Sequence, residues 1–109
     1  MRERADEPAA EHLLGCPEGT RQTSARSDDG LEEFCVEAAN TRHGPWAQWD
    51  TQGRKRRDGS YEHGVQQGVW TVYDEDGRLH LQGQLVAGKR SGVWTYYHLN
   101  GGKRSESTY

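Results

Sequence analysis

The chain has 109 residues, about the size of one small domain. Only 31% of the residues are hydrophobic and the mean hydropathy is −1.12, which is near the range of disordered chains. Fourteen glycines, four tryptophans and five tyrosines argue against disorder and indicate a thin core of large rings. Residues 1–40 carry a net charge of −6 and residues 41–109 a net charge of +3. Neither value indicates a nucleic-acid partner, and no DNA binding is expected. No apolar run approaches the roughly 20 residues of a membrane-spanning helix.

The N-terminal part, residues 1–28, is predicted to be a flexible acidic leader. It contains the sequence LLGC at Leu13–Cys16, which resembles the lipid-attachment box of bacterial lipoproteins. That box requires a basic and then an apolar run before it, whereas the preceding residues RERADEPAAEH are charged. As written, the sequence therefore predicts a cytoplasmic protein. An exported or lipid-anchored protein is expected only if the true N-terminus lies elsewhere.

Cys16 and Cys35 are the two cysteines of the chain. They form no Cys-x-x-Cys motif and no histidine pair lies near them at metal-ligand spacing, so neither zinc nor any other metal or cofactor is expected. Two interpretations stay open. The cysteines form a disulfide that ties the leader to the first hairpin, or they are two free thiols.

The C-terminal part repeats itself at an interval of about 24 residues, which is in the range typical of stacked supersecondary units. The segment GVWTVYDEDG at Gly68–Gly77 is repeated with few changes as GVWTYYHLNG at Gly92–Gly101. Gly59 and Gly83 keep the same interval. The recurring large side chains, predicted to form the repeat core, are Trp46, Trp70 and Trp94, then Trp49, Tyr73 and Tyr97, then Tyr61, Leu85 and Tyr109. The recurring turn glycines are Gly44, Gly68 and Gly92, then Gly53, Gly77 and Gly101, then Gly64 and Gly88.

Each repeat is typical of a β-hairpin. The β-branched and aromatic run VWTVYD predicts a strand, DEDG a turn, the alternating run RLHLQGQLV a second strand and AGKRSG a second turn. The expected fold is all-β, a single-layer antiparallel array of stacked hairpins. Its repeats are 44–67, 68–91 and 92–109, and residues 29–43 form a degenerate capping hairpin. Trp70 and Tyr73 are three residues apart, so either both sheet faces carry rings or a bulge redirects one of them.

The segments YEHGVQQGVWTVYDEDGRL and LVAGKRSGVWTYYHLNGGK resemble the MORN repeat in its bacterial variant form. That form reads as aromatic, two residues, Gly, three residues, Gly, one residue, Trp, two residues, aromatic, three residues, Gly. The resemblance covers residues 44–109, more than half of the chain. It implies a sheet of hairpins that acts in binding or scaffolding, in some members at membranes or on acidic lipids. Bacterial variant-repeat proteins are often labelled antitoxins, and no catalytic residues accompany the repeat.

We therefore expect a non-catalytic protein-interaction or scaffold module, in one form an antitoxin-type neutraliser of a partner protein. No nucleophile elbow or Ser–His–carboxylate motif is evident, so an enzyme is not expected. The alternative is a peripheral membrane module that binds acidic lipid head groups, although alternation along a strand divides basic residues between faces. The residues considered for contact with anions are Arg54, Lys55, Arg56, Arg57, Lys89 and Arg90.

Two further expectations concern histidines and the C-terminal strand. None of the five histidines, His12, His43, His63, His80 and His98, recurs at the repeat interval, so all are expected to be solvated. The last strand, roughly 102–109, is expected to expose a sheet edge. That edge pairs with a second copy to give a homodimer, receives a partner's strand, or stays solvated. Replacing Ser105 or Ser107 with proline is expected to remove one outward-facing N–H.

Overall fold

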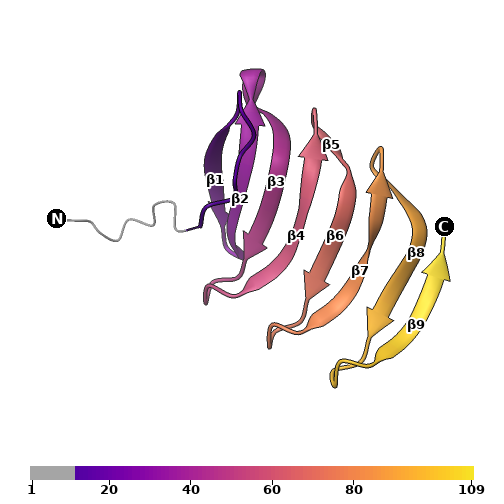
Figure 1. Ribbon diagram of the computed structural model, residues 1–109. Coiled ribbons are helices and arrows are strands. Elements are labelled where there is room, and N and C mark those ends of the chain that lie inside the picture. The colour runs from indigo at the N-terminus through magenta and orange to yellow at the C-terminus, as the bar shows by residue number, and fades with distance from the viewer. Residues whose placement is uncertain (1–11) are drawn as a thin grey trace.

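The computed structural model describes residues 12–109, which form one antiparallel sheet (Figure 1). The strands lie side by side in the order β1-β2-β3-β4-β6-β7-β8-β9, and the short β5 pairs with β4. Their bounds are β1 Arg21–Ser27, β2 Gly30–Glu37, β3 Thr41–Trp49, β4 Lys55–Glu62, β5 Val65–Gln66, β6 Gly68–Tyr73, β7 Leu79–Val86, β8 Lys89–Tyr97 and β9 Lys103–Thr108. The predicted all-β array of hairpins is confirmed.

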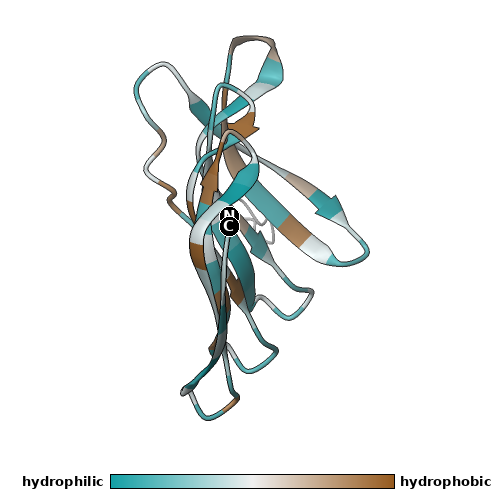
Figure 2. Ribbon diagram, turned by 90° about the vertical axis from the view of Figure 1, so that its right-hand side faces the viewer, coloured by the Kyte–Doolittle hydropathy of each residue, from teal (hydrophilic) through white to brown (hydrophobic). Residues whose placement is uncertain are grey.

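Outside the strands, the described residues contain one short turn with 3₁₀ hydrogen bonding, η1 (Ala38–Asn40), in which Ala39 has a non-helical φ of 63°. No helix there is long and apolar enough to cross a membrane. The sheet is elongated, with principal extents of 48 × 31 × 22 Å, and its first and last strands lie at opposite ends (Figure 1). Apolar residues form only short segments along the strands (Figure 2). Each strand therefore depends on its immediate neighbours, as in other repeat proteins.

The turns at one end of the sheet recur at the repeat interval. One of them lies in residues 29–43, the part of the chain expected to be a degenerate hairpin. The pairs Ala39-Asn40, His63-Gly64 and Ala87-Gly88 all have positive φ, between 48° and 91°. Two consecutive positive φ values are typical of the tight turns that match the twist of a β-hairpin. The backbone conformation of the repeat is therefore present before Gly44, although the recurring residues of the sequence motif start only at Gly44.

A bulge recurs at the same interval and determines how the rings are distributed. In the β6–β7 ladder Val72 lies opposite Leu81 but Tyr73 lies opposite Leu79, so His80 is the extra residue. Because the bulge is on β7, Tyr73 follows Val72 in regular alternation and points away from the face that carries Trp70. Arg56 and Arg104 are the extra residues in the equivalent ladders. Both faces of the sheet therefore carry rings. We call them the tryptophan face (with Trp46, Trp70 and Trp94) and the reverse face (with Trp49, Tyr73 and Tyr97).

The tryptophan face holds the core. The Trp46 and Trp70 rings stack with centroids 4.9 Å apart, and Tyr61 meets Trp70 edge to face at 5.6 Å. The Trp70 ring lies over Gly59, and the Trp94 ring lies over Gly83. A Cβ atom added at either glycine would come well inside 3.0 Å of the indole. The recurring glycines of β4 and β7 thus leave the space that the next tryptophan fills.

Hydrogen bonds of the indoles follow the same repeat. Trp70 Nε1 donates to the Ser60 carbonyl at 3.2 Å, and Trp94 Nε1 donates to the Gln84 carbonyl at 3.1 Å. Trp46 differs because Phe34, not a glycine, lies opposite it on β2. Its buried Nε1 has no hydrogen-bond partner among the described residues. The first hairpin closes the core with a ring in place of the tryptophan-over-glycine contact.

The sheet begins earlier than the sequence indicates. Residues 21–27 were expected in the leader but form β1, which pairs along its whole length with β2. The prediction failed because RQTSARS contains a single apolar residue and shows no apolar alternation. The capping hairpin is therefore β1–β2, which starts at Arg21, and it is not confined to residues 29–43. The part of the predicted leader in residues 1–11 lies outside the described residues.

Candidate functional site

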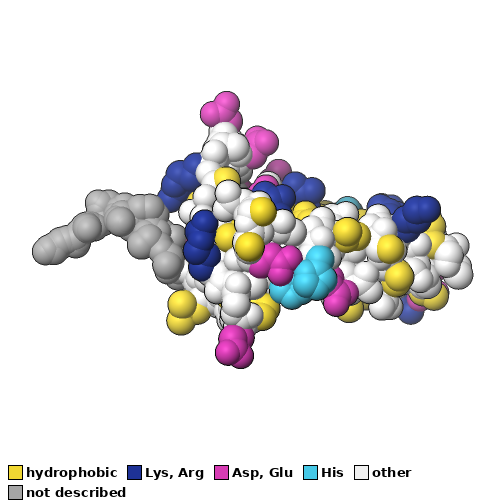
Figure 3. Space-filling model, turned by 90° about the horizontal axis from the view of Figure 1, so that it is seen from above, with side chains coloured by type: hydrophobic (Ala, Val, Ile, Leu, Met, Phe, Trp, Pro, Cys, Tyr) yellow, Lys and Arg dark blue, Asp and Glu magenta, His cyan; other side chains and the backbone are white. Residues whose placement is uncertain are grey.

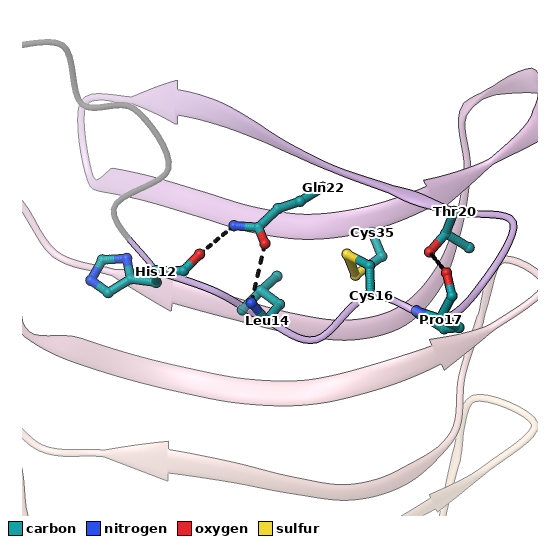
Figure 4. The surroundings of a disulfide bond; sticks show 7 residues. All are labelled: His12, Leu14, Cys16, Pro17, Thr20, Gln22 and Cys35. Carbon is teal, nitrogen blue, oxygen red and sulfur yellow. Dashed lines mark hydrogen bonds between the residues drawn. A yellow bond between two sulfur atoms is a disulfide. The ribbon is translucent and has the colours of Figure 1, made fainter.

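An N-terminal segment, residues 12–20, lies across β1–β3 and is held there by a disulfide between Cys16 and Cys35 (Figure 4). The structure thus adopts the first of the two cysteine states that the sequence left open. The Cα atoms are 5.6 Å apart. Gln22 on β1 adds two hydrogen bonds, since its amide nitrogen donates to the His12 carbonyl and its amide oxygen accepts from Leu14 N–H at 3.1 Å.

The same segment covers a buried carboxyl group. Glu33 on β2 is 1% exposed, and its Oε1 lies 2.6 Å from His12 Nδ1. The His12 ring also stacks on Trp49, with centroids 3.7 Å apart. Burying an unpaired carboxylate is costly, so this contact makes the N-terminal segment part of the folded sheet.

Beyond β3 the reverse face carries a polar row in which each residue lies opposite the next across the strands. The row consists of Asp58, Thr71, Gln82, Thr95 and Glu106. Its two carboxylates pair with lysines three residues earlier, Lys55 with Asp58 at 3.1 Å and Lys103 with Glu106 at 2.8 Å. Partial burial and the nearby Asp58 carboxylate raise the pKa of Tyr73. The acidic groups of this row are therefore already paired within the chain.

The residues predicted to form the repeat core divide between the faces. Trp46, Trp70, Leu85 and Trp94 are buried in one cluster with Tyr61 against it. Trp49, Tyr73 and Tyr97 lie on the reverse face, and Tyr109 is 55% exposed with its hydroxyl bonded to Arg90. The repeat pattern missed three residues of this core, namely Phe34 and Val36 in the cluster and Leu81 packed against it. All eight predicted turn glycines have φ between 71° and 110°, as expected for positions that favour glycine. Five of them lie in turns, but Gly44, Gly68 and Gly92 lie within β3, β6 and β8, so the prediction of a turn is wrong for these three.

The predicted anion-contact residues do not form one patch. Arg54 and Arg56 both approach the Asp50 carboxylate, at 3.1 and 3.9 Å, and Lys55 is bound to Asp58. Arg57 Nε donates to Gln48 at 2.6 Å.

The other two basic residues lie at the opposite ends of the strands, at the start of β8. Arg90 lies 4.5 Å from the centroid of the Trp94 ring and donates hydrogen bonds to the hydroxyls of Tyr96 and Tyr109. Lys89 is exposed. The predicted cations are thus separated along the strands, and most of them are engaged with carboxylates or rings of the same sheet.

A cluster that the sequence did not predict lies at the end of the sheet that carries the positive-φ turns. Glu37 ends β2, His43 lies on β3 and His63 lies in the turn after β4, and their ligand atoms lie within 4.8 Å of one another. Figure 3 views this end and shows histidine side chains gathered beside acidic ones. The hydrogen bond to Glu37 and the charge of that carboxylate raise the pKa of His63. No periodicity signals the cluster, because its three members come from different positions in the repeat.

Among the described residues no strand pairs with the outer edge of β9, and the hydrogen bonds of β9 show which backbone groups face that edge. Gly92 and Tyr109 exchange both backbone hydrogen bonds, at 3.2 and 2.9 Å. Residues in an antiparallel ladder alternate between such pairs and positions whose N–H and C=O point away. The register is regular from Ser105 to Thr108. Ser105 and Ser107 therefore direct their N–H groups to β8, and Glu106 and Thr108 direct theirs outward. The expectation that proline at Ser105 or Ser107 removes an outward N–H is wrong.

Comparisons of the chain with protein-family models, curated proteins and solved structures found no match. The likeness to MORN repeats rests on the motifs quoted above.

Proposed function

We propose that the protein is a non-catalytic protein-interaction module whose β9 edge pairs with an extended strand of a partner protein. The observation that carries this proposal is the open edge of β9. All six residues of the strand are exposed, and the outward groups of Glu106 and Thr108 have no strand beside them in the described residues. Such an edge is a template for strand addition, in which main-chain hydrogen bonds provide affinity.

The motif resemblance to MORN repeats supports the same class of function, since it implies binding and scaffolding. An antitoxin-type neutraliser of a partner protein is one specific form of this proposal. A homodimer formed by two β9 edges is another, because an isologous pairing of two antiparallel edges satisfies both copies.

Binding to acidic lipid is the alternative proposal, and the distribution of the basic residues does not favour it. Surface attraction to an anionic membrane needs several free cations on one side. Here Arg54, Lys55 and Arg56 contact carboxylates of the same sheet. Sedimentation with vesicles of acidic phospholipid at low salt tests the alternative. We expect no more binding by the wild type than by a variant in which these three residues are glutamine. Strong wild-type binding that the variant loses would favour the lipid proposal.

We also propose that the protein folds in an oxidising compartment, which differs from the cytoplasmic expectation based on the leader sequence. Disulfides persist mainly in secreted, periplasmic and related environments. The Cys16–Cys35 bond fixes the segment whose His12 contacts the buried Glu33, which supports this proposal. Alkylation of the protein recovered from its native cells, with and without prior reduction, measures the state of the two cysteines.

The edge proposal is tested by replacing Thr108 with proline and, as a matched control, with alanine. Thr108→Pro removes one outward N–H and leaves the hydrogen bonds to β8 intact, whereas Thr108→Ala changes only the side chain. We expect Thr108→Pro to abolish partner capture in pull-downs read by mass spectrometry, or dimerisation in analytical ultracentrifugation. Thr108→Ala should retain it. Unchanged partner binding and oligomeric state in the proline variant would show that the edge is not the interface.

A further inference from the structure

Glu37, His43 and His63 bring two imidazoles and one carboxylate together from three separate segments of the chain. The Glu37 Oε2 and His63 Nδ1 atoms are 3.0 Å apart. The two histidine rings face each other, with centroids 4.4 Å apart and planes inclined by 29°. Two histidines and one carboxylate form a donor set found in zinc sites with three protein ligands, where water or another ligand completes the coordination.

The backbone brings together the segments that carry these three residues before any ion binds. Glu37 lies opposite Thr41 in the β2–β3 ladder, and Thr41 is two residues before His43 on β3. The turn that carries His63 is tied to β3 by a hydrogen bond from Gly64 N–H to the Arg42 carbonyl at 2.7 Å. His63 has φ 48°, a left-handed conformation imposed by the turn. The ligand-bearing segments are therefore positioned by the sheet itself.

We propose that Glu37, His43 and His63 form a binding site for a borderline divalent transition-metal ion of the Zn²⁺ type, with the remaining coordination position open to solvent. Ligands of tetrahedral zinc at about 2.0–2.1 Å from the ion lie roughly 3.3 Å from each other. The Glu37–His63 pair is already near that separation at 3.0 Å. The third ligand atom lies within 4.8 Å of the others, so side-chain rotation of His43 completes the site.

The charge of the donor set supports a dication. The Glu37 carboxylate offsets part of the charge of the ion, and Glu62 contributes a further negative charge near His63. Imidazole nitrogens select Zn²⁺, Ni²⁺ or Cu²⁺ over Mg²⁺ and Ca²⁺, which prefer all-oxygen ligands. The side chain of His63 is 70% exposed and that of Glu37 28% exposed, so an ion reaches the site directly from solvent.

Metal binding has a specific structural signature at His63. The His63 backbone N–H donates to His43 Nδ1 at 2.9 Å, so the Nδ1 of a neutral His43 ring carries the lone pair and its Nε2 carries the proton. Coordination through Nδ1 takes this lone pair. Coordination through Nε2 requires the proton to move to Nδ1. Both routes break the hydrogen bond, so the amide resonance of His63 must shift when the ion binds.

The test uses Zn²⁺ alone as the probe on the full, disulfide-bonded chain after treatment with EDTA. Isothermal titration calorimetry should give one site for the wild type with Zn²⁺ and no comparable binding with Mg²⁺. The variants are Glu37→Gln, His43→Gln and His63→Asn, in which asparagine tolerates the positive φ better than alanine does. Each variant should weaken Zn²⁺ affinity by at least about tenfold. Loss of a residue that only hydrogen-bonds a metal ligand already lowers metal affinity by about 10–100-fold, and these residues are proposed as ligands themselves. His98→Ala removes an exposed histidine far along the sheet and should leave the affinity unchanged.

Folding of each variant is checked by its circular dichroism spectrum and its ¹H–¹⁵N correlation spectrum without metal. In the wild-type spectrum Zn²⁺ should shift the His63 amide and its neighbours. Zn²⁺ affinity that survives in His63→Asn or falls equally in His98→Ala would overturn the proposal. Absence of Zn²⁺ binding by the folded wild type would also overturn it.

Discussion

Gly83 offers a direct test of the packing that the repeat encodes. The Trp94 ring lies over this glycine, and an added Cβ atom would come well inside 3.0 Å of the indole, a separation that real Cβ atoms essentially never show. Gly83 does not have a positive φ, so alanine fits its backbone conformation. The whole penalty of Gly83→Ala therefore comes from displacement of a ring that is 4% exposed.

The expected magnitude follows from two opposing effects. Overpacking a well-filled core costs about 1–3 kcal/mol. Where no clash occurs, replacing glycine with alanine stabilises by about 0.4–1 kcal/mol because the unfolded chain loses conformational freedom. We therefore expect Gly83→Ala to lower the free energy of unfolding of the wild type, but to raise it slightly in a Trp94→Ala background.

Urea denaturation followed by circular dichroism measures these four free energies of unfolding in a double-mutant cycle. An excluded osmolyte such as TMAO keeps the Trp94→Ala background folded, and it is added to all four proteins. The coupling between the two positions should reach roughly 1.5–4 kcal/mol, from the sum of the two effects above. The tryptophan-over-glycine account would be refuted if Gly83→Ala left the free energy of unfolding of the wild type unchanged. It would also be refuted if the substitution lowered that free energy equally in both backgrounds.

Three other perturbations test the core, the disulfide and a turn. Trp70→Ala should cost about 3–5 kcal/mol, because Trp70 packs on both Trp46 and Tyr61, and an unchanged melting temperature would contradict this. Reducing the Cys16–Cys35 bond, which spans 19 residues, should lower the free energy of unfolding by about 3 kcal/mol, measured by denaturation with and without reductant. Hydrogen bonds from the N–H groups of Arg78 and Asp76 hold the pKa of Asp74 below its usual value of 3.8. Its contribution to stability is therefore present above the unfolded pKa and is lost as the pH falls through the lower folded pKa. An NMR titration of Asp74 that gives a pKa at or above 3.8 would contradict that assignment.

The period of the sequence was enough to predict the hairpins, because two recurring features mark their parts. Gly53, Gly64, Gly77, Gly88 and Gly101 mark turns with positive φ, and a β-branched and aromatic run between such turns marks a strand. The structure confirms both for β6, β7 and β8. The distribution of the rings was not predictable in the same way. It depends on whether the bulge is on β6 or β7, and composition does not show that His80 is the extra residue.

β1 and the histidine cluster were not predicted from the sequence, for different physical reasons. β1 is exposed and polar along most of its length, so burial leaves no pattern in its sequence. The cluster of Glu37, His43 and His63 is set by cross-strand pairing and by a turn that folds back onto β3, which are long-range properties. The direction of the β9 hydrogen bonds is also a long-range property. It follows from the phase of the ladder at Gly92 and Tyr109, which residue types do not reveal.

Ser107 limits what can occupy the proposed β9 edge. It occupies the position that Gly59 and Gly83 hold in the two preceding repeats, where the next hairpin's tryptophan lies over a glycine. Ser107 carries a Cβ and a hydroxyl at that place, so a tryptophan brought by an added strand would meet the same obstruction that Gly83→Ala creates. The outward N–H groups of Glu106 and Thr108 meanwhile remain available for backbone pairing. The proposed edge therefore offers backbone pairing to an added strand but not the tryptophan-over-glycine packing seen at Gly59 and Gly83. We expect a partner strand to carry a small residue beside Ser107.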